Sequence, residues 1–291
     1  MKIVKHLLFT AALLCAGIAA ASKPQPAVCN TPEGVVKLMS FNIRQSGLAK
    51  KDGPDRWPKR RAAVAAMLAD ECPTVLGIQE GLIDQVRFLE KNLPLYTRIG
   101  VGRDDGAEGG EMMAVFFLTD RYEELGSGTF WLSETPQTVS RGWDAACNRT
   151  VTWVHLRERA TGKSFFYLNT HFDHEGAEAR RRSSELIVSW IEGNVPAGAT
   201  VVVGGDLNSD IGDEALRPFR ESLETAREIS DPTDRGGTFN SFGAAPGNIV
   251  LDHFFCRNTT GDRSLRVVRK NYGAPSYVSD HFPVVFTFEL P

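Results

Sequence analysis

Acidic, amide and histidine side chains lie at the ends of six apolar segments that read as strands. They are Asn42, Glu80, His171, Asp206 with Asn208, Asp252, and Asp280 with His281. A carboxylate beside a buried strand is costly to desolvate unless it is paired, hydrogen-bonded or bound to a metal. A turn or a helix cap explains one such residue. Six of them are better explained by a single shared site.

These residue types suit one chemistry. The oxygens of Glu80, Asp252, Asp280 and the Asn42 amide are ligands that Mg²⁺, Mn²⁺ or Ca²⁺ prefer. Histidines supply charge or protons near neutral pH. In the run VVVGGDLN, alternation along a strand places Asp206 and Asn208 on one face, and two glycines leave room for other parts of the site. Together they predict metal-assisted hydrolysis of a phosphate ester.

The hydrophobic pattern predicts elements that would hold these residues. Helical spacing of apolar residues occurs at 58–70, 82–92 and 178–192. Short apolar runs predict strands, with a stretch free of convincing helices between 95 and 170. The strand ranges are 35–43, 73–80, 111–118, 128–132, 149–156, 163–171, 200–206, 248–256, 264–268 and 283–290. We therefore expect an α/β fold, a four-layer α/β/β/α sandwich of two mixed sheets flanked by helices.

Six motifs, in order, resemble the endonuclease/exonuclease/phosphatase superfamily, whose members include deoxyribonuclease I. They are SFNIR, GIQE, NTHFDH, GGDLNS, LDHFF and SDHFPV, and the likeness covers about residues 35–289. The segments GVGRDDGAEGGE and GTFWLSETP are similar to an exported bacterial branch of hydrolases. Leu207 and Leu251 depart from the commoner Phe and Ile, but neither is a reacting group.

The resemblance implies a role for each motif residue. Asn42 and Glu80 would hold the principal metal, with Asp280 helping from the other side, and one or two ions would bind. Asp206 would orient or deprotonate the attacking water, and Asn208 would place water and phosphate. His281 and His171 would stabilise the charged transition state, and Asp252 would fix the tautomer of one histidine.

Three further residues are predicted to contact the substrate: Trp143, Arg149 and Asp173. Arg149 suits a bidentate phosphate clamp, although a surface salt bridge explains it equally well. Trp143 is suited to stacking on a base or sugar, with simple packing as the alternative. The glycine-rich segment 100–110 leads into a strand, so we expect a mobile rim loop with Glu111 supporting the site.

The first 21 residues predict a secretory signal peptide, because Lys2 and Lys5 precede an apolar run that ends in Ala19-Ala20-Ala21. A short core helix or an anchor is the alternative. We expect a leader at 22–34, a single domain at 35–291, and a periplasmic or secreted location. Export permits disulfides, and Cys29–Cys72 is favoured because the two cysteines flank the starts of the first two predicted strands.

Net charge bears on the substrate. Loss of the signal peptide leaves 31 of the 33 basic residues against 36 acidic ones. Proteins that grip duplex nucleic acid are usually basic, so tight duplex binding is disfavoured. The prediction is a monomeric, exported phosphoesterase that does not insert into membranes and acts on a small molecule, a lipid headgroup or a nucleic acid. A nuclease, or an inactive binding protein on the same fold, is the alternative.

Overall fold

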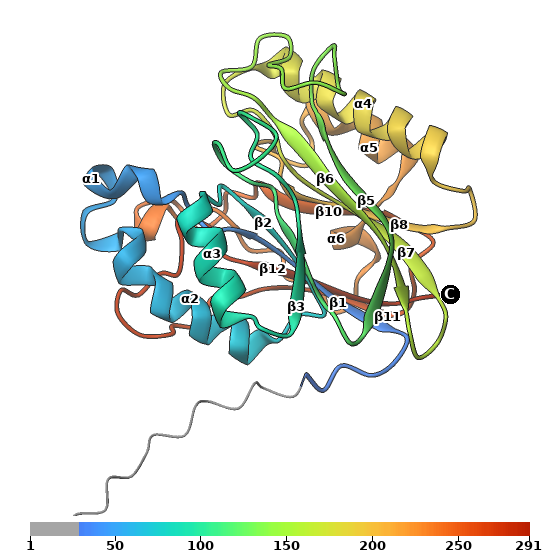
Figure 1. Cartoon of the computed structure of the whole chain (residues 1–291), viewed down its shortest axis with the longest axis horizontal. Helices are drawn as coiled ribbons and strands as arrows, with labels where there is room; N and C mark the ends of the chain where they lie inside the picture. The colour runs from blue at the N-terminus through green and yellow to red at the C-terminus, as the bar shows by residue number, and fades with distance from the viewer. Residues whose placement is uncertain (1–28) are drawn as a thin grey trace, which may run out of the picture.

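A computed structural model describes residues 29–291 of the chain. The predicted signal peptide, 1–21, and the leader up to residue 28 lie outside the described residues. Two sheets pack face to face, and helices cover the two outer faces (Figure 1). The predicted four-layer α/β/β/α sandwich is confirmed.

The first sheet contains six strands in the order β11-β12-β1-β2-β4-β3. Their bounds are β11 (Thr260–Val267), β12 (Val284–Glu289), β1 (Val35–Asn42), β2 (Val75–Gln79), β4 (Val115–Leu118) and β3 (Tyr96–Ile99). β1 pairs in parallel with β2 and antiparallel with β12.

The second sheet also has six strands, in the order β5-β6-β7-β8-β10-β9. Their bounds are β5 (Tyr122–Trp131), β6 (Thr150–Glu158), β7 (Ser164–His171), β8 (Thr200–Asp206), β10 (Asp252–Arg257) and β9 (Glu224–Thr225). β7 and β8 are parallel, and β10 runs antiparallel to β8.

Apolar side chains on both faces of the central strands explain why these strands read as unbroken apolar runs. Neighbouring residues on a strand point to opposite faces, so Leu38 joins the core between the sheets while Met39 joins the core under the helices. On the other sheet, Val202 likewise joins the core between the sheets, and Val203 joins the core under the helices.

Helices α2 (Trp57–Glu71) and α3 (Ile83–Asn92) supply apolar side chains to the outer core of the first sheet. Pro58 occupies the first turn of α2, where its missing N–H costs nothing. α4 (Ala177–Asn194) and α5 (Arg217–Ser222) cover the second sheet, where Ile187, Ile191 and Phe219 are buried.

The helices α2, α3 and α4 match the predicted ranges, but several strands do not: β5 begins at Tyr122 and not at 128, and β11 begins at Thr260 and not at 264. Only 115–118 of the predicted strand 111–118 is a strand, because Met112 makes isolated bridges to Gly81 and Gly102 instead. Strand β3 and the short helices α1 (Ala49–Asp52), α5 and α6 (Ala226–Ile229) were not predicted. Segments of two to six residues are too short to carry a periodic pattern.

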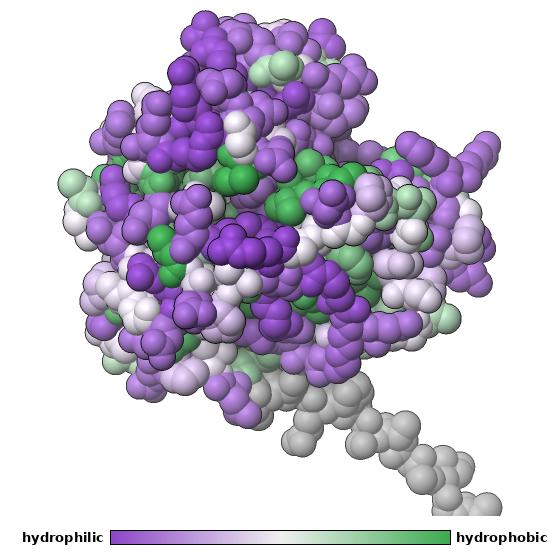
Figure 2. Space-filling model, turned by 180° about the vertical axis from the view of Figure 1, so that it is seen from behind, coloured by the Kyte–Doolittle hydropathy of each residue, from purple (hydrophilic) through white to green (hydrophobic). Residues whose placement is uncertain are grey.

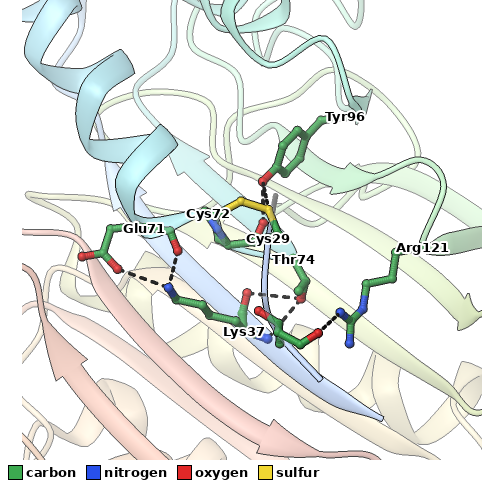
Figure 3. The surroundings of a disulfide bond; sticks show 9 residues. Cys29, Lys37, Glu71, Cys72, Thr74, Tyr96 and Arg121 are labelled. Carbon is green, nitrogen blue, oxygen red and sulfur yellow. Dashed lines mark hydrogen bonds and ion pairs between the residues drawn. A yellow bond between two sulfur atoms is a disulfide. The ribbon is translucent and has the colours of Figure 1, made fainter. Parts of the chain in front are cut away.

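Cys29 and Cys72 form a disulfide, as predicted (Figure 3). It joins the segment before β1 to the residue that ends α2 in a left-handed conformation. The Tyr96 hydroxyl lies 3.9 Å from Cys29 Sγ and donates a 2.7 Å hydrogen bond to the Pro73 carbonyl. The bridge lies near the start of β1 and therefore at the opposite end of this strand from Asn42.

Seen from behind, the surface is mostly hydrophilic, with apolar side chains gathered in a strip across its middle (Figure 2). Among residues 29–291, the large apolar side chains that are exposed are Leu95, Leu125 and Val139. Within the same range, no helix has the length and apolar character needed to cross a membrane.

Candidate active site

The strand directions bring the predicted residues to one edge of the sandwich. β1, β2, β7 and β8 all deliver their carboxyl ends there, with Asn42, Glu80, His171 and Asp206. β10 and β12 run antiparallel to their neighbours, so the same edge receives the beginning of β10, with Asp252, and the approach to β12, with Asp280 and His281.

A cleft of about 690 Å³ opens at this edge. Seven of the predicted site residues line it: Glu80, Arg149, His171, Asp206, Asn208, Asp280 and His281. Asn42, Asp252 and Asp173 are buried and contact these lining residues by hydrogen bonds. Side chains from both sheets therefore meet at one place.

Asp206 is the centre of the cluster. Its Oδ2 lies 3.4 Å from His171 Nε2, 3.6 Å from His281 Nε2 and 2.9 Å from the Asn42 amide nitrogen. The carboxylate is 1% exposed. Burial, together with the Asp252 carboxylate, raises the pKa of Asp206 to about 7, against the opposing effect of His281. A carboxylate with this pKa is suited to accept a proton near neutral pH.

His281 is held as a cation. Its Nδ1 lies 2.9 Å from Asp252 Oδ2, which fixes the ring and leaves Nε2 facing Asp206. Burial alone would lower the pKa of His281, but the carboxylates of Asp252 and Asp206 outweigh burial and raise it to about 10.

His171 has the opposite character. Burial lowers its pKa well below the ordinary value, and the nearby Arg149 and Arg103 guanidinium groups lower it further. The Asn208 amide nitrogen lies 3.0 Å from His171 Nε2 and donates to the Phe172 carbonyl at 2.9 Å. The site thus places a charged and a neutral imidazole on either side of Asp206.

The predicted metal residues lie on one side of the cleft. Glu80 Oε1 accepts from the Asn42 amide at 3.0 Å, and Oε2 accepts from the Gln45 backbone N–H at 3.1 Å. Burial raises the pKa of Asp280, and the Glu80 carboxylate raises it further, so the two acids are close enough to repel each other. A cation between them fits this repulsion and the oxygen donor set.

Asn42 fits the metal less directly. Its amide oxygen accepts the Arg44 backbone N–H at 3.0 Å, and its nitrogen faces Glu80 and Asp206. Coordination through the amide oxygen would require the side chain to turn.

Two other groups have ligand atoms close together. Asp206, Asp252 and His281 form one group, in which His281 Nδ1 and Asp252 Oδ2 already pair with each other at 2.9 Å. Cys147, Asp173 and His174 form the other, and there the Arg149 guanidinium contacts both Asp173 and His174. Glu80 and Asp280 offer oxygen donors, which suit a hard cation, although Arg44 Nη1 lies 3.3 Å from Asp280 Oδ2 and would have to move for a cation to bind there.

Two site residues adopt left-handed backbone conformations just after their strands: Glu80 with φ 62° and Asn208 with φ 47°. β8 ends at Asp206, and the Asn208 N–H donates to Asp206 Oδ1 at 3.0 Å. The expectation that strand alternation brings Asp206 and Asn208 to one face was therefore wrong, because a tight turn does so. Such conformations carry strain that functional sites often hold.

The two glycines of β8 also have a different role from the one predicted. A Cβ on Gly204 would lie 2.3 Å from the Phe254 ring, and one on Gly205, where φ is +147°, would lie 1.9 Å from the Thr170 carbonyl oxygen. The glycines make room for the neighbouring strands β10 and β7, not for other parts of the site.

The three residues predicted to contact the substrate differ in their positions relative to the cleft. Arg149 lines the cleft and is 4% exposed, so its pairing with Asp173 at 3.2 Å is not a surface salt bridge. Asp173 is 1% exposed and its Oδ1 accepts three backbone N–H groups, which makes it a support for Arg149. Trp143 is half-buried and is not among the residues that line the cleft.

His253 follows Asp252 in the LDHFF motif but lies outside the cleft. It is buried, and its Nε2 lies 2.9 Å from the Ser209 carbonyl oxygen. Because neighbours on a strand face opposite ways, the motif delivers only Asp252 to the site.

Glu111 was expected to support the site, whereas four other cleft residues had no predicted role: Arg44, Gln45, Arg103 and Phe239. Arg103 Nη1 donates to Glu111 Oε2 at 2.6 Å, and Glu111 Oε1 accepts from the Gln45 side chain at 2.7 Å. Arg44 Nη1 lies 3.3 Å from Asp280 Oδ2, and the Phe239 ring packs edge-on against His281. Arg103 lies in a loop without periodic pattern, so nothing in the sequence singles it out.

The segment 102–111 is held by many hydrogen bonds. Asp105 Oδ1 accepts the N–H groups of Ala107 and Gly109, and the Arg103 carbonyl accepts from Trp131 Nε1 at 2.8 Å. These hydrogen bonds hold Arg103 and Glu111 at the rim of the cleft, and the expected mobility of this loop stays a prediction. Burial is the main reason that the pKa of Glu111 rises to about 7, with Arg103 opposing the rise.

Comparison with known proteins agrees with this geometry. The model of the endonuclease/exonuclease/phosphatase family matches residues 39–281. The chain belongs to this family. A search of curated proteins gave no match. A family structure from Bacteroides vulgatus is 34% identical, with 88% of this chain and 99% of the other covered and a TM-score of 0.82.

Other family structures are also similar. A mannosyl-6-phosphatase from Bacteroides thetaiotaomicron is 32% identical over 86% of this chain and 98% of its own, with a TM-score of 0.80. The human Nocturnin catalytic domain, at 19% identity over 88% of this chain and 94% of its own, shares the fold with a TM-score of 0.67. As a member of this family, the protein is a hydrolase acting on phosphoric ester bonds.

Proposed function

We propose that the protein is an exported, divalent-metal-dependent phosphoesterase that hydrolyses a P–O bond by in-line attack of an activated water. The observation that carries the proposal is the buried Asp206 carboxylate, whose Oδ2 lies close to two histidines, the cationic His281 and the neutral His171. It provides a proton acceptor and a cation within 3.6 Å of each other. The mannosyl-6-phosphatase neighbour supports a phosphate ester as the substrate.

Asp206 is the proposed proton acceptor. Its pKa of about 7 allows it to take a proton from water as the water attacks phosphorus. Asn208 is held against His171 and the Phe172 carbonyl, so its amide has a fixed position for the phosphoryl group.

His281 would stabilise the negative charge that develops on the phosphoryl oxygens. Asp252 keeps its Nδ1 occupied, so only the Nε2–H points toward the reacting group. A preorganised charged donor of this kind lowers the transition-state energy without reorganisation cost.

The carboxylates of Glu80 and Asp280, with Asn42 after rotation of its amide, would hold the cation. When bound, Mg²⁺, or Mn²⁺ or Ca²⁺ in its place, would polarise a phosphoryl oxygen. One or two ions are compatible with the donor set.

Export to the periplasm or outside the cell is supported by the signal-like first 21 residues and by the Cys29–Cys72 disulfide. Disulfides persist in oxidising compartments and are rare in the cytosol.

The test is hydrolysis of phosphate esters by purified protein with and without Mg²⁺. We expect EDTA to abolish turnover and added Mg²⁺ to restore it. Asp206→Asn and His281→Asn should each lower kcat by about 10³-fold or more, while the melting temperature stays close to that of the wild type. Near-wild-type turnover in either variant would overturn the assigned roles.

A further inference from the structure

One wall of the cleft contains polar atoms whose hydrogen-bonding capacity is unmet. Among the described residues that line the cleft, Arg103 Nε, Arg149 Nη1 and His171 Nδ1 are buried and have no hydrogen-bond partner. A buried charged donor without an acceptor costs free energy. The nearest carboxylates, Asp104 at 3.9 Å from Arg103 Nε and Glu111 at 4.0 Å from His171 Nδ1, are too distant for hydrogen bonds, so this wall can receive a group that accepts them.

The two arginines are held in place from behind. Arg149 Nε pairs with Asp173, and its Nη2 lies 2.9 Å from His174 Nδ1. The Arg103 carbonyl accepts from Trp131 and from the Asn148 amide, which also donates to Asp104 at 3.2 Å. Asn148 thus ties the loop of Arg103 to the segment that carries Arg149.

The opposite wall has the reverse character. Glu80, Asp280 and Asp206 line that part of the cleft and are suited to a cation. A phosphoryl group between the two walls would face the bound cation on one side and, on the other, two guanidinium groups whose partners Glu111 and Asp173 leave Arg103 Nε and Arg149 Nη1 free to donate. On the arginine side, the positive charge comes from Arg103 and Arg149 and does not depend on a bound cation.

We infer that this enzyme selects phosphate monoesters, because Arg103 and Arg149 receive the phosphoryl oxygen that a monoester leaves unsubstituted and charged. The inference rests on the proposed phosphoesterase function. In a diester the same oxygen carries carbon, so it would bring an uncharged, bulkier group against two guanidinium groups.

The experiment compares two substrates with the same leaving group: para-nitrophenyl phosphate, a monoester, and methyl para-nitrophenyl phosphate, a diester. kcat/KM is measured for both in the presence of Mg²⁺. The variants are Arg149→Met and Arg103→Met, which remove the charge but keep much of the apolar volume. Arg121→Met is the matched control, since Arg121 is also a largely buried arginine, paired with Glu158 and absent from the lining of this cleft.

The wild type is expected to prefer the monoester. Each cleft variant should lose about 10- to 100-fold in kcat/KM for the monoester and less than about 5-fold for the diester, because a charge-assisted hydrogen bond is lost only with the monoester. Arg121→Met should leave the ratio of the two substrates unchanged. Equal losses on both substrates, or a wild-type preference for the diester or for plasmid DNA, would overturn the inference.

A binding measurement can distinguish failure of this inference from failure of the proposed function. It also gives a result for a variant that is too unstable for kinetic measurements. Inorganic phosphate should raise the melting temperature of the wild type more than dimethyl phosphate does, and Arg103→Met should remove the difference. If the wild type hydrolyses neither ester, the proposed function fails and the inference fails with it. If it hydrolyses both but Arg103→Met keeps the phosphate shift, only the inference fails.

Discussion

The two histidines of the site carry different charges although both are buried. His281 has three acidic neighbours that raise its pKa, whereas His171 has two arginines that lower it. Burial lowers the pKa of both rings, so the charged side chains beside each histidine decide the difference in charge between them. One histidine is suited to stabilise negative charge and the other to accept a hydrogen bond.

At the same scale, Asp173 controls the position of Arg149. Three backbone N–H groups and Arg149 hold the pKa of Asp173 well below its usual range, against burial that would raise it. A carboxyl with a lowered folded pKa stabilises the fold above its ordinary pKa, and the contribution is lost as the pH falls toward the folded value.

We expect Asp173→Asn to lower the free energy of unfolding by about 3 kcal/mol at pH 7, because it leaves the buried Arg149 charge unpaired. Urea unfolding between pH 3 and pH 8 checks this. The difference between wild type and variant should be constant above about pH 5 and should shrink below about pH 4. A difference that grows in acid would contradict it.

Residue type and position were enough to predict the polar groups at the strand ends. Asn42, Glu80 and Asp206 are conspicuous because each interrupts an apolar run. Arg103 lies in a loop, where a charged residue is ordinary, and only the fold brings it beside Arg149. The wall of the cleft that Arg103 and Arg149 form together could therefore not be predicted from the sequence, although Arg149 alone was a candidate.

At the scale of elements, the glycines of β8 decide how closely three strands pack. Gly205 has φ +147°, and its hydrogen faces the backbone of β7. A methyl group there would collide with the Thr170 carbonyl, next to the catalytic edge.

We expect Gly205→Ala to lower the free energy of unfolding by about 2–4 kcal/mol, from steric overlap and backbone strain together. It should also lower kcat, because Asp206 follows directly. Thermal unfolding and steady-state kinetics check both effects. Gly193→Ala in α4 is the control, since a Cβ there meets no atom within 4 Å. A stable and fully active Gly205→Ala protein would contradict this packing argument.

The long helices were predictable because they carry a repeat of apolar positions, as in α2 and α4, whereas only the second half of β5 was predicted because its first half, YEELGS, contains no apolar run. The turn after β8 was not, because Asn208 leaves the strand through a left-handed conformation that the alternation rule does not foresee.

At the scale of the whole molecule, the disulfide attaches the segment before β1 to the end of α2. It closes 43 residues of chain, for which the loss of chain entropy predicts a stabilisation of about 4 kcal/mol. It lies far along β1 from the catalytic edge. Removal of the disulfide should therefore lower the free energy of unfolding without changing the geometry of the cleft.

We expect the Cys29→Ala, Cys72→Ala double variant to unfold at lower urea concentration with kcat unchanged.

Wild-type protein recovered from the periplasm or medium should start near residue 22 and show two reactive thiols when denatured, from Cys147 and Cys256. Four thiols in such material would contradict both the bridge and the oxidising compartment.

The proposed reacting groups and the proposed selecting groups occupy different parts of the architecture. Asp206, His171 and Asp252 are anchored in the sheets, while Arg103 and Arg149 belong to two loop segments joined through Asn148. During divergence after gene duplication, exchange of these loops would leave Asp206 and Asp252 on their strands, although it would also change the pKa of His171, which both arginines lower. New ester specificities are thus accessible from one unchanged scaffold by short insertions or replacements at the rim.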